Sequence, residues 1–99
     1  MNPAEVCVLL PAMNEAETVG SVVAGFRDVG FDEVLVVDGG SDDDTRARAR
    51  DAGARVVEQC GHGKGQAIRQ AIDEEIHRPV VLMADADGTY DPADAERML

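Results

Sequence analysis

Short apolar runs alternate along the chain with polar segments rich in glycine and aspartate. Between the first two runs, Val19, Val22, Val23 and Phe26 recur at the i, i+3, i+4, i+7 spacing of an amphipathic helix, which we expect to end at Gly30. The runs themselves have the length and composition of buried strands. They lie at residues 6–10, where Pro11 is expected to stop the strand, and at 34–37, 55–57 and 80–84.

Further helices are predicted from their start and stop signals. Ser41 is a suitable N-cap for a helix through Ala52, with Asp42, Asp43 and Asp44 as the charges of its first turn. A third helix is expected after the glycine-rich segment 61–65, and one more from Pro92. Strands alternating with helices imply right-handed crossovers and a mainly parallel sheet. We therefore expect an α/β fold, a three-layer α/β/α arrangement of Rossmann-like type, with residues 1–99 as one domain.

The charge balance narrows the range of partners. Twenty acidic residues against nine basic ones give a net charge of −11, which argues against nucleic acid and against an anionic membrane surface. The acids are spread along the chain, as on a solvated surface, and suggest a salt-adapted source. The arginines between residues 46 and 55 are expected to offset neighbouring acids, with i, i+4 support from Asp42 and Asp44.

The cysteines and the apolar runs indicate the cellular compartment in which the protein is expected. Cys7 and Cys60 lie far apart, and Cys7 falls in a strand pattern, where a small buried side chain is expected rather than a disulfide. The sequence shows neither a signal-peptide pattern nor an apolar run of membrane-spanning length. These features lead us to expect a cytoplasmic protein.

Carboxylates gather where the predicted strands end. Asp85 and Asp87 follow the apolar run 80–84 at an i, i+2 spacing. In a parallel sheet the loops after the strands share one edge, so Asn14, Glu15 and Asp38 are expected at the same edge. Two adjacent carboxylates repel each other unless a cation lies beside them, and a hard divalent ion completes its shell with substrate phosphates. The pattern predicts a site for Mg²⁺ or Mn²⁺ and a phosphorylated ligand.

The segment Gly61-His62-Gly63-Lys64-Gly65 has two interpretations. It is not a Walker P-loop, because Gly65 follows the lysine where serine or threonine is required. It is either a plain flexible turn or, since three glycines surround Lys64 at a predicted helix start, an anion contact.

Four motifs in order resemble the family 2 glycosyltransferases of GT-A fold. These motifs are Pro11-Ala12-Met13-Asn14-Glu15, Val37-Asp38-Gly39-Gly40-Ser41 with Asp43 and Thr45, Gly63-Lys64-Gly65, and Asp85-Ala86-Asp87. Their order and spacing cover nearly the whole chain and are more specific than any single motif. Among subgroups the chain looks most like the archaeal dolichyl-phosphate hexose synthases and related polyprenyl-phosphate sugar transferases. The glucosyl-3-phosphoglycerate synthases share some of the same motifs.

The resemblance implies roles for individual residues. The segment with Pro11, Ala12, Asn14 and Glu15 would border the nucleotide base and ribose, and Asp38 would contact the base beside Gly40. Many relatives carry a second acid after Asp38, where this chain has Gly39. Lys64 would lie near the donor diphosphate. Within Asp85-Ala86-Asp87, which would complete the nucleotide-sugar site, Asp87 would bind the metal directly, and Asp85 would face the ribose or a metal-bound water.

By the same resemblance, the function is hexosyl transfer from a nucleotide-diphosphate sugar, with a UDP-sugar as the better expectation, to a dolichyl or polyprenyl phosphate. Asp85 and Asp87 would be the catalytic pair. Family members continue past the D-x-D motif into a half that supplies the acceptor site. The chain therefore corresponds to the donor-binding half, for which we expect donor and metal binding, little transfer alone, and self-association through strand edges. The full-length protein would work at the cytoplasmic face of the membrane.

Two other interpretations remain open from the residues. An apolar strand followed by Asp85-Ala86-Asp87-Gly88-Thr89 also resembles the first motif of haloacid-dehalogenase-type phosphatases, although there the motif normally opens the domain. The alternative outside enzymology is a nucleotide-binding module without turnover. A calcium loop starting at Asp85 is excluded, because Tyr90 occupies the position that requires glycine.

Overall fold

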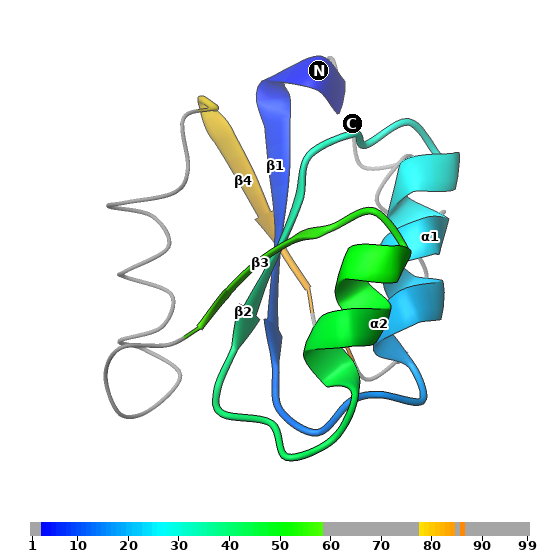
Figure 1. Cartoon of the computed structure of the whole chain (residues 1–99). Coiled ribbons are helices and arrows are strands. Elements are labelled where there is room, and N and C mark those ends of the chain that lie inside the picture. Colours follow the sequence, from blue (N-terminus) through cyan, green and yellow to red (C-terminus); the bar gives the residue numbers. More distant parts are fainter. Residues whose placement is uncertain (1–2, 59–77, 85, 87–99) are drawn as a thin grey trace.

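The structure is a computed structural model, and it describes residues 3–58, 78–84 and 86. Strands and helices alternate as the hydrophobic pattern predicts (Figure 1). The elements in chain order are a short 3-10 turn η1 (Pro3–Glu5), β1 (Val6–Ala12), α1 (Val19–Asp28), β2 (Val34–Asp38), α2 (Thr45–Asp51), β3 (Arg55–Glu58) and β4 (Val80–Met83).

The four described strands form one parallel sheet in the order β3-β2-β1-β4. The chain runs from β1 outward to β2 and β3 and then returns to the other side of β1 with β4. Between β1 and β4 the direction of the connections therefore reverses, and ligands of open α/β sheets bind at such a point, beyond the carboxyl ends of the strands. The predicted parallel α/β fold is confirmed.

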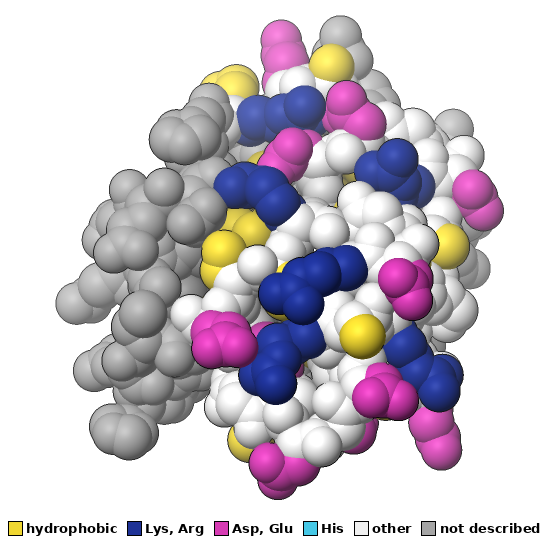
Figure 2. All heavy atoms as spheres, viewed as in Figure 1, with side chains coloured by type: hydrophobic (Ala, Val, Ile, Leu, Met, Phe, Trp, Pro, Cys, Tyr) yellow, Lys and Arg dark blue, Asp and Glu magenta, His cyan; other side chains and the backbone are white. Residues whose placement is uncertain are grey.

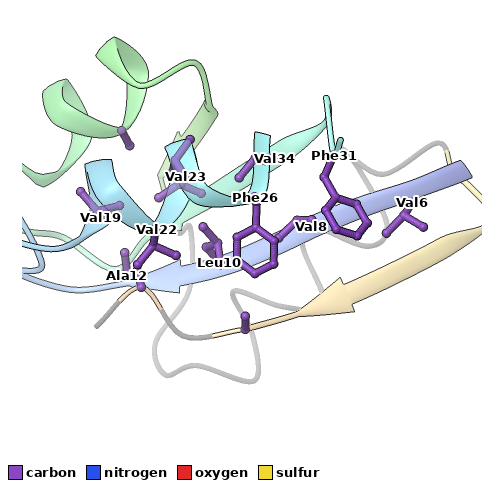
Figure 3. Close-up of a cluster of buried hydrophobic side chains, with 14 residues drawn as sticks. Val6, Val8, Leu10, Ala12, Val19, Val22, Val23, Phe26, Phe31 and Val34 are labelled. Carbon is purple, nitrogen blue, oxygen red and sulfur yellow. The ribbon is translucent and has the colours of Figure 1, made fainter. Parts of the chain in front are cut away.

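Both described helices pack on one face of the sheet, where the main core lies (Figure 3). Alternate residues of β1 point to this face, and α1 presents the stripe predicted from its spacing. Phe26 and Phe31 meet edge to face, with ring centroids 6.0 Å apart. The core side chains shown in the figure include Val6, Val8, Leu10, Ala12, Val19, Val22, Val23 and Val34.

The opposite face of β1 and β2 is also buried. Cys7, Leu9, Leu35 and Val37 form a second apolar cluster and are at most 1% exposed. Burial on both faces explains why these strands read as continuous apolar runs. Cys7 is free and buried, as predicted, and burial raises the pKa of its thiol. The helices predicted after the glycine-rich segment 61–65 and from Pro92 lie outside the described residues, as does Cys60.

Several predicted boundaries differ from those of the structure. Pro11 does not stop β1, which continues through Ala12. The Val8 N–H donates toward the β2 side, so alternation would direct a donor at position 11 toward β4, and the β1–β4 register already ends at Leu9. The missing N–H of Pro11 therefore costs no ladder hydrogen bond.

The second helix begins three residues later than predicted, with Asp44 rather than Ser41 before its first residue. The Ser41 hydroxyl is bonded to Asp38 instead of capping the helix. The predicted strand 80–84 ends at Met83. Gly30, at a φ of 111°, follows α1 as predicted.

Within the described part of the chain, no helix has the length and apolar character needed to cross a membrane. Figure 2 shows arginine side chains interspersed with aspartate and glutamate on the face formed by α2 and β3. The acidic residues do not separate into a single block on this face.

Replacing Phe26 with alanine tests the main core. Phe26 is fully buried between α1 and the sheet, so Phe26→Ala should lower the free energy of unfolding by about 3–5 kcal/mol. The measurement is urea unfolding in high salt. Met83→Ala is the control, because Met83 is 52% exposed and its loss should change stability by less than about 0.5 kcal/mol. Equal effects of the two substitutions would contradict the placement of the core.

Candidate functional site

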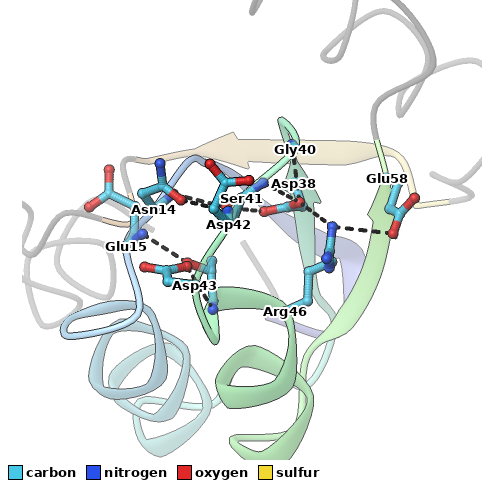
Figure 4. A network of polar contacts seen from close by, with 10 residues as sticks. Asn14, Glu15, Asp38, Gly40, Ser41, Asp42, Asp43, Arg46 and Glu58 are labelled. Atoms are coloured by element: carbon cyan, nitrogen blue, oxygen red, sulfur yellow. Dashed lines mark hydrogen bonds and ion pairs between the residues drawn. The ribbon is translucent and has the colours of Figure 1, made fainter.

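Asn14, Glu15 and Asp38, predicted at the carboxyl edge of the sheet, do lie there (Figure 4). Asn14 and Glu15 are on the loop after β1, and Asp38 is the last residue of β2. Ala12 and Asp38 end the two strands opposite each other in the register. The Gly39 N–H donates to the Ala12 carbonyl at 2.9 Å, so the loops leave the sheet as neighbours. The strand periodicity thus explains how residues far apart in sequence meet at this edge.

Asp38 is the buried centre of the edge. Residues 34, 36 and 38 of β2 point to the helix side, which carries the Asp38 side chain beneath α2. The side chain is 0% exposed. Its Oδ2 accepts hydrogen bonds from the Gly40 N–H at 3.1 Å and the Ser41 N–H at 3.0 Å, and its Oδ1 accepts one from the Ser41 hydroxyl. Gly40 supports this turn with a φ of 101°, which glycine adopts without strain.

Arg46 completes the charge balance at Asp38. Its Nη1 lies 3.0 Å from Asp38 Oδ2 and 3.3 Å from Oε1 of Glu58. Asp38 and Glu58 are in-register partners on β2 and β3, so the two carboxylates would repel each other without a cation between them. The predicted i, i+4 role is not what the structure shows, since Arg46 pairs with these strand ends.

Two hydrogen bonds at Asn14 cross-link the β1–α1 loop to the β2–α2 loop. The Asn14 N–H donates to Ser41 Oγ at 2.9 Å, and the Asp42 N–H donates to Asn14 Oδ1 at 2.8 Å. Asn14 has a φ of 53°, in the left-handed region that asparagine tolerates better than most residues. The side-chain oxygen of Asn14 therefore already accepts a hydrogen bond from the neighbouring loop.

Two more cross-links follow along the same loops. The Glu15 N–H donates to the Thr45 hydroxyl oxygen at 2.9 Å, and the Ala16 N–H donates to Asp43 Oδ2 at 3.2 Å. The Thr45 N–H and hydroxyl donate to the other oxygen of Asp43. These hydrogen bonds, that of the Thr45 hydroxyl first, lower the pKa of the Asp43 carboxyl. Asp43 therefore joins the two loops and was not simply a charge of the first helical turn.

The segment after β4 is attached to the start of α1. Thr18 Oγ1 donates to the Ala86 carbonyl at 2.6 Å, across 68 positions of sequence. Ala86 is 1% exposed, and the Ala84 N–H donates to the Leu9 carbonyl at 3.1 Å. The centre of the Asp85-Ala86-Asp87 motif is thus fixed beside the β1–α1 loop.

Three of the predicted site residues, Lys64, Asp85 and Asp87, lie outside the described residues. Within the described ranges no group of three or more His, Cys, Asp or Glu side chains is arranged to hold a metal ion. The metal ligands expected from the motif therefore remain a prediction. Carboxylate oxygens fit Mg²⁺ and Mn²⁺, and the anchored Ala86 stands between the two proposed ligands in sequence.

The remaining predicted residues differ in what they can offer a ligand. Pro11 is half-buried and Ala12 is buried at the end of β1. Glu15 is half-buried and lines a shallow cleft of about 230 Å³. The other residues of this cleft are Asn14, Ala16, Glu17, Thr18 and Asp43. Three carboxylates around one cleft favour a cation or a cation-bound ligand over a bare anion.

Sequence reasoning missed several residues that build this edge. Thr18, Glu58 and the bridging role of Arg46 were not identified. The alternation of β2 does place Asp38 on the helix side, which was the available signal for a partner from α2. Thr18 and Glu58 carry no comparable signal, because their contacts depend on how separate segments meet.

Removal of the Ser41 hydroxyl tests the link between the loops. Ser41→Ala leaves Asp38 Oδ1 and the Asn14 N–H without this partner, so the free energy of unfolding should fall by about 1–3 kcal/mol. Ser21→Ala is the matched control, because the exposed Ser21 hydroxyl bonds only locally, to the Thr18 carbonyl. Urea unfolding of the two variants gives the comparison. Equal losses of unfolding free energy would show that the Ser41 link does not stabilise the protein more than an exposed local hydrogen bond does.

The lowered pKa of the Asp43 carboxyl predicts that the stability of the protein depends on pH. A carboxyl whose pKa is lowered by folding stabilises the protein above its ordinary value of about 3.9 and loses that effect as the pH falls through the folded pKa. Asp43→Asn should therefore be less stable than the parent at pH 6, and the gap should close below pH about 3.9. Thermal unfolding across this range measures it. Asp42→Asn is the control, because Asp42 joins the network through its backbone N–H. A gap independent of pH would contradict the argument.

Comparison with known proteins gives a family match and close relatives. Residues 7–99 match the family described as Glycosyl transferase family 2. The chain is 57% identical over 97 residues to "Glycosyltransferase AglJ" of Haloferax volcanii, covering 98% of this chain and 32% of that protein. It is 42% identical over 88 residues to the "Dolichyl-phosphate hexose transferase" of the same organism, covering 87% of this chain and 38% of that protein. The chain thus spans about a third of the length of these relatives.

Solved structures give the same fold. Glucosyl-3-phosphoglycerate synthase from Mycobacterium tuberculosis in complex with UDP superposes with a TM-score of 0.81 at 33% identity, covering 91% of this chain and 36% of that one. The same enzyme in complex with Mn²⁺, UDP and glucosyl-3-phosphoglycerate gives a TM-score of 0.74 at 35% identity, covering 82% of this chain and 33% of that one. The motifs, the parallel sheet and these matches agree, and the chain belongs to glycosyl transferase family 2.

Proposed function

We propose that the chain is the donor-binding half of a metal-assisted hexosyltransferase that takes its sugar from a nucleotide diphosphate, with UDP-hexose as the donor. The observation that carries the proposal is the Thr18–Ala86 hydrogen bond, which holds the D-x-D segment against the β1–α1 loop at the point where the sheet connections reverse. That point is where open α/β sheets bind nucleotides. The complexes of the mycobacterial enzyme with UDP and Mn²⁺ support the choice of ligand.

The proposed roles divide the donor among the loops. The β1–α1 loop, with Pro11, Ala12, Asn14 and Glu15, borders the nucleoside, and the β2–α2 loop closes the base end at Asp38 and Gly40. Lys64 supplies a positive charge to the diphosphate. Asp87, with Asp85 beside it, holds the metal ion. When bound, Mg²⁺ or Mn²⁺ would neutralise the charge that develops on the leaving diphosphate.

The acceptor in this proposal is a dolichyl or polyprenyl phosphate. The relative named a dolichyl-phosphate hexose transferase supports this class of acceptor. A phosphate monoester is largely ionised at neutral pH, so it can attack the anomeric carbon without a protein base. We assign its site to the part of the relatives that this chain does not match, and place the reaction at the cytoplasmic face of the membrane. The Haloferax relatives fit the salt-adapted source inferred from the net charge.

The phosphatase alternative is disfavoured, because the family match extends from residue 7 to residue 99 and so includes the D-x-D motif. A nucleotide-binding module without turnover would bind the same donor and would differ from the proposed enzyme only in not transferring the sugar. Donor binding is therefore the property to test first.

Calorimetric titration of the protein with UDP and with GDP, in high salt with and without Mn²⁺, tests the proposal. UDP should bind more tightly than GDP, and Mn²⁺ should strengthen its binding. Asp87→Ala should weaken Mn²⁺-dependent binding at least about tenfold, since a metal ligand is lost. Asp51→Ala, an exposed acid at the end of α2, is the control and should bind as the parent does. A folded parent that binds neither nucleotide would overturn the proposal.

A further inference from the structure

We propose that Arg46 reads the nucleobase of the donor by donating to a keto oxygen, with Asp38 and Glu58 holding its guanidinium in place. This inference rests on the proposed donor site and adds to it a residue that sets base selectivity. A keto oxygen is present at position 4 of uracil and position 6 of guanine, whereas cytosine and adenine carry an amino group there. The predicted preference is therefore for uracil over cytosine.

Asp38 does not reach a ligand directly. Its side chain is 0% exposed. It accepts hydrogen bonds from two backbone N–H groups, one hydroxyl and one guanidinium of its own chain. Three of these donors bond to Oδ2 and one to Oδ1, and the burial of the side chain closes the remaining acceptor position of Oδ1 to a ligand. With the loop in this arrangement, a base at this edge is contacted by a side chain next to Asp38 and not by Asp38 itself.

Arg46 is the neighbour with donors to spare. A single nitrogen, Nη1, makes the contacts to both Asp38 and Glu58. Among the described residues nothing accepts a hydrogen bond from its Nε or Nη2, and its side chain is 33% exposed. Because Nη1 lies 3.0 Å from the Asp38 carboxylate, a base edge placed over Asp38 comes within reach of the remaining N–H groups.

The two carboxylates fix the orientation of the guanidinium. They come from the ends of adjacent strands, in register, and so approach Arg46 from two rigid elements (Figure 4). A planar guanidinium held at one nitrogen presents its other N–H groups in a fixed direction, and all of them are donors. A keto oxygen satisfies these donors, whereas an amino group placed there confronts donor with donor. Such an arrangement discriminates by chemistry as well as by shape.

An ion pair that only stabilises the loop predicts something different. In that case the loss of Arg46 would disturb the site for every nucleotide alike and leave the ratio of affinities unchanged. The ratio for UDP over CDP is therefore the decisive quantity, because these ligands share the ribose and the diphosphate.

The experiment compares Kd values for UDP and CDP, both with Mn²⁺, in the parent and in Arg46→Gln. The glutamine amide can turn to donate or to accept, so the preference for UDP should fall about tenfold, the size expected for one base contact. Arg46→Lys keeps a charged donor and should retain most of the preference. Arg55→Gln is the matched control, because Arg55 is also ion-paired, to Glu33, at the other end of β3. High salt limits long-range effects of the lost charge on the diphosphate.

The outcomes separate the two proposals. A parent that binds UDP with a preference over CDP, lost in Arg46→Gln and kept in Arg55→Gln, supports the inference. A parent that binds UDP while Arg46→Gln keeps the parent ratio overturns the inference and leaves the donor site standing. A parent that binds no nucleotide overturns both. Thermal unfolding of each variant shows whether it is folded. If Arg46→Gln is not folded, the ratio of UDP to CDP affinity is measured in Arg46→Met instead, where a lost preference supports the inference and a kept preference overturns it.

Discussion

Asp38 ends the inner strand β2 with a carboxylate that is closed to solvent, and much of the carboxyl edge of the sheet is arranged around it. An ionised group removed from water costs several kcal/mol unless donors and a counter-charge surround it. The β2–α2 loop supplies the donors by turning back through Gly40 and Ser41. α2 supplies the charge through Arg46, whose second contact removes the repulsion between Asp38 and Glu58. The late start of α2 follows from this demand, since the residues that could have begun the helix are engaged in the loop.

The arrangement around Asp38 extends to the neighbouring loop because Ser41 has two roles. Its hydroxyl donates to Asp38 and its oxygen accepts from the Asn14 N–H, so the buried charge and the β1–α1 loop are joined through one atom. Asp43 and Thr45 add parallel links, and Thr18 carries the connection onward to Ala86. Segments that the sequence separates by 27 to 68 positions therefore form one hydrogen-bonded edge. Such an edge is preorganised, and a ligand bound there loses less free energy to ordering the loops.

Much of the fold could be predicted from local pattern, because burial imposes a period of two on strands and of 3.6 on helices. The stripe of α1, the four strands and their parallel arrangement follow from that constraint.

Ser41 shows where local pattern fails. A serine before a run of helix-forming residues is a good cap, but it is also three residues after a buried aspartate, and sequence does not rank the two partners. Arg46 shows a second limit, since its role depends on Asp38 and Glu58 being in register across two strands. For the site, the sequence correctly predicted that its polar residues gather at the carboxyl edge of the sheet. The places of Lys64, Asp85 and Asp87 remain predictions.

The distribution of charge at this edge bears on how a donor could approach it. Glu15, Glu17 and Asp43 line the cleft beside the β1–α1 loop, whereas the Arg46 guanidinium lies at the ends of β2 and β3. A nucleotide diphosphate is an anion, and its approach to the acidic cleft is unfavourable unless a divalent cation accompanies it. The neutral base suffers no such repulsion, and the guanidinium attracts its keto oxygen. The charges alone thus favour an orientation with the base toward β2 and β3 and the metal-bound diphosphate toward the segment after β4. This orientation agrees with the motif order inferred from sequence in placing the base at the end of β2 and the metal at the D-x-D acids, although Arg46 rather than the buried Asp38 would contact the base.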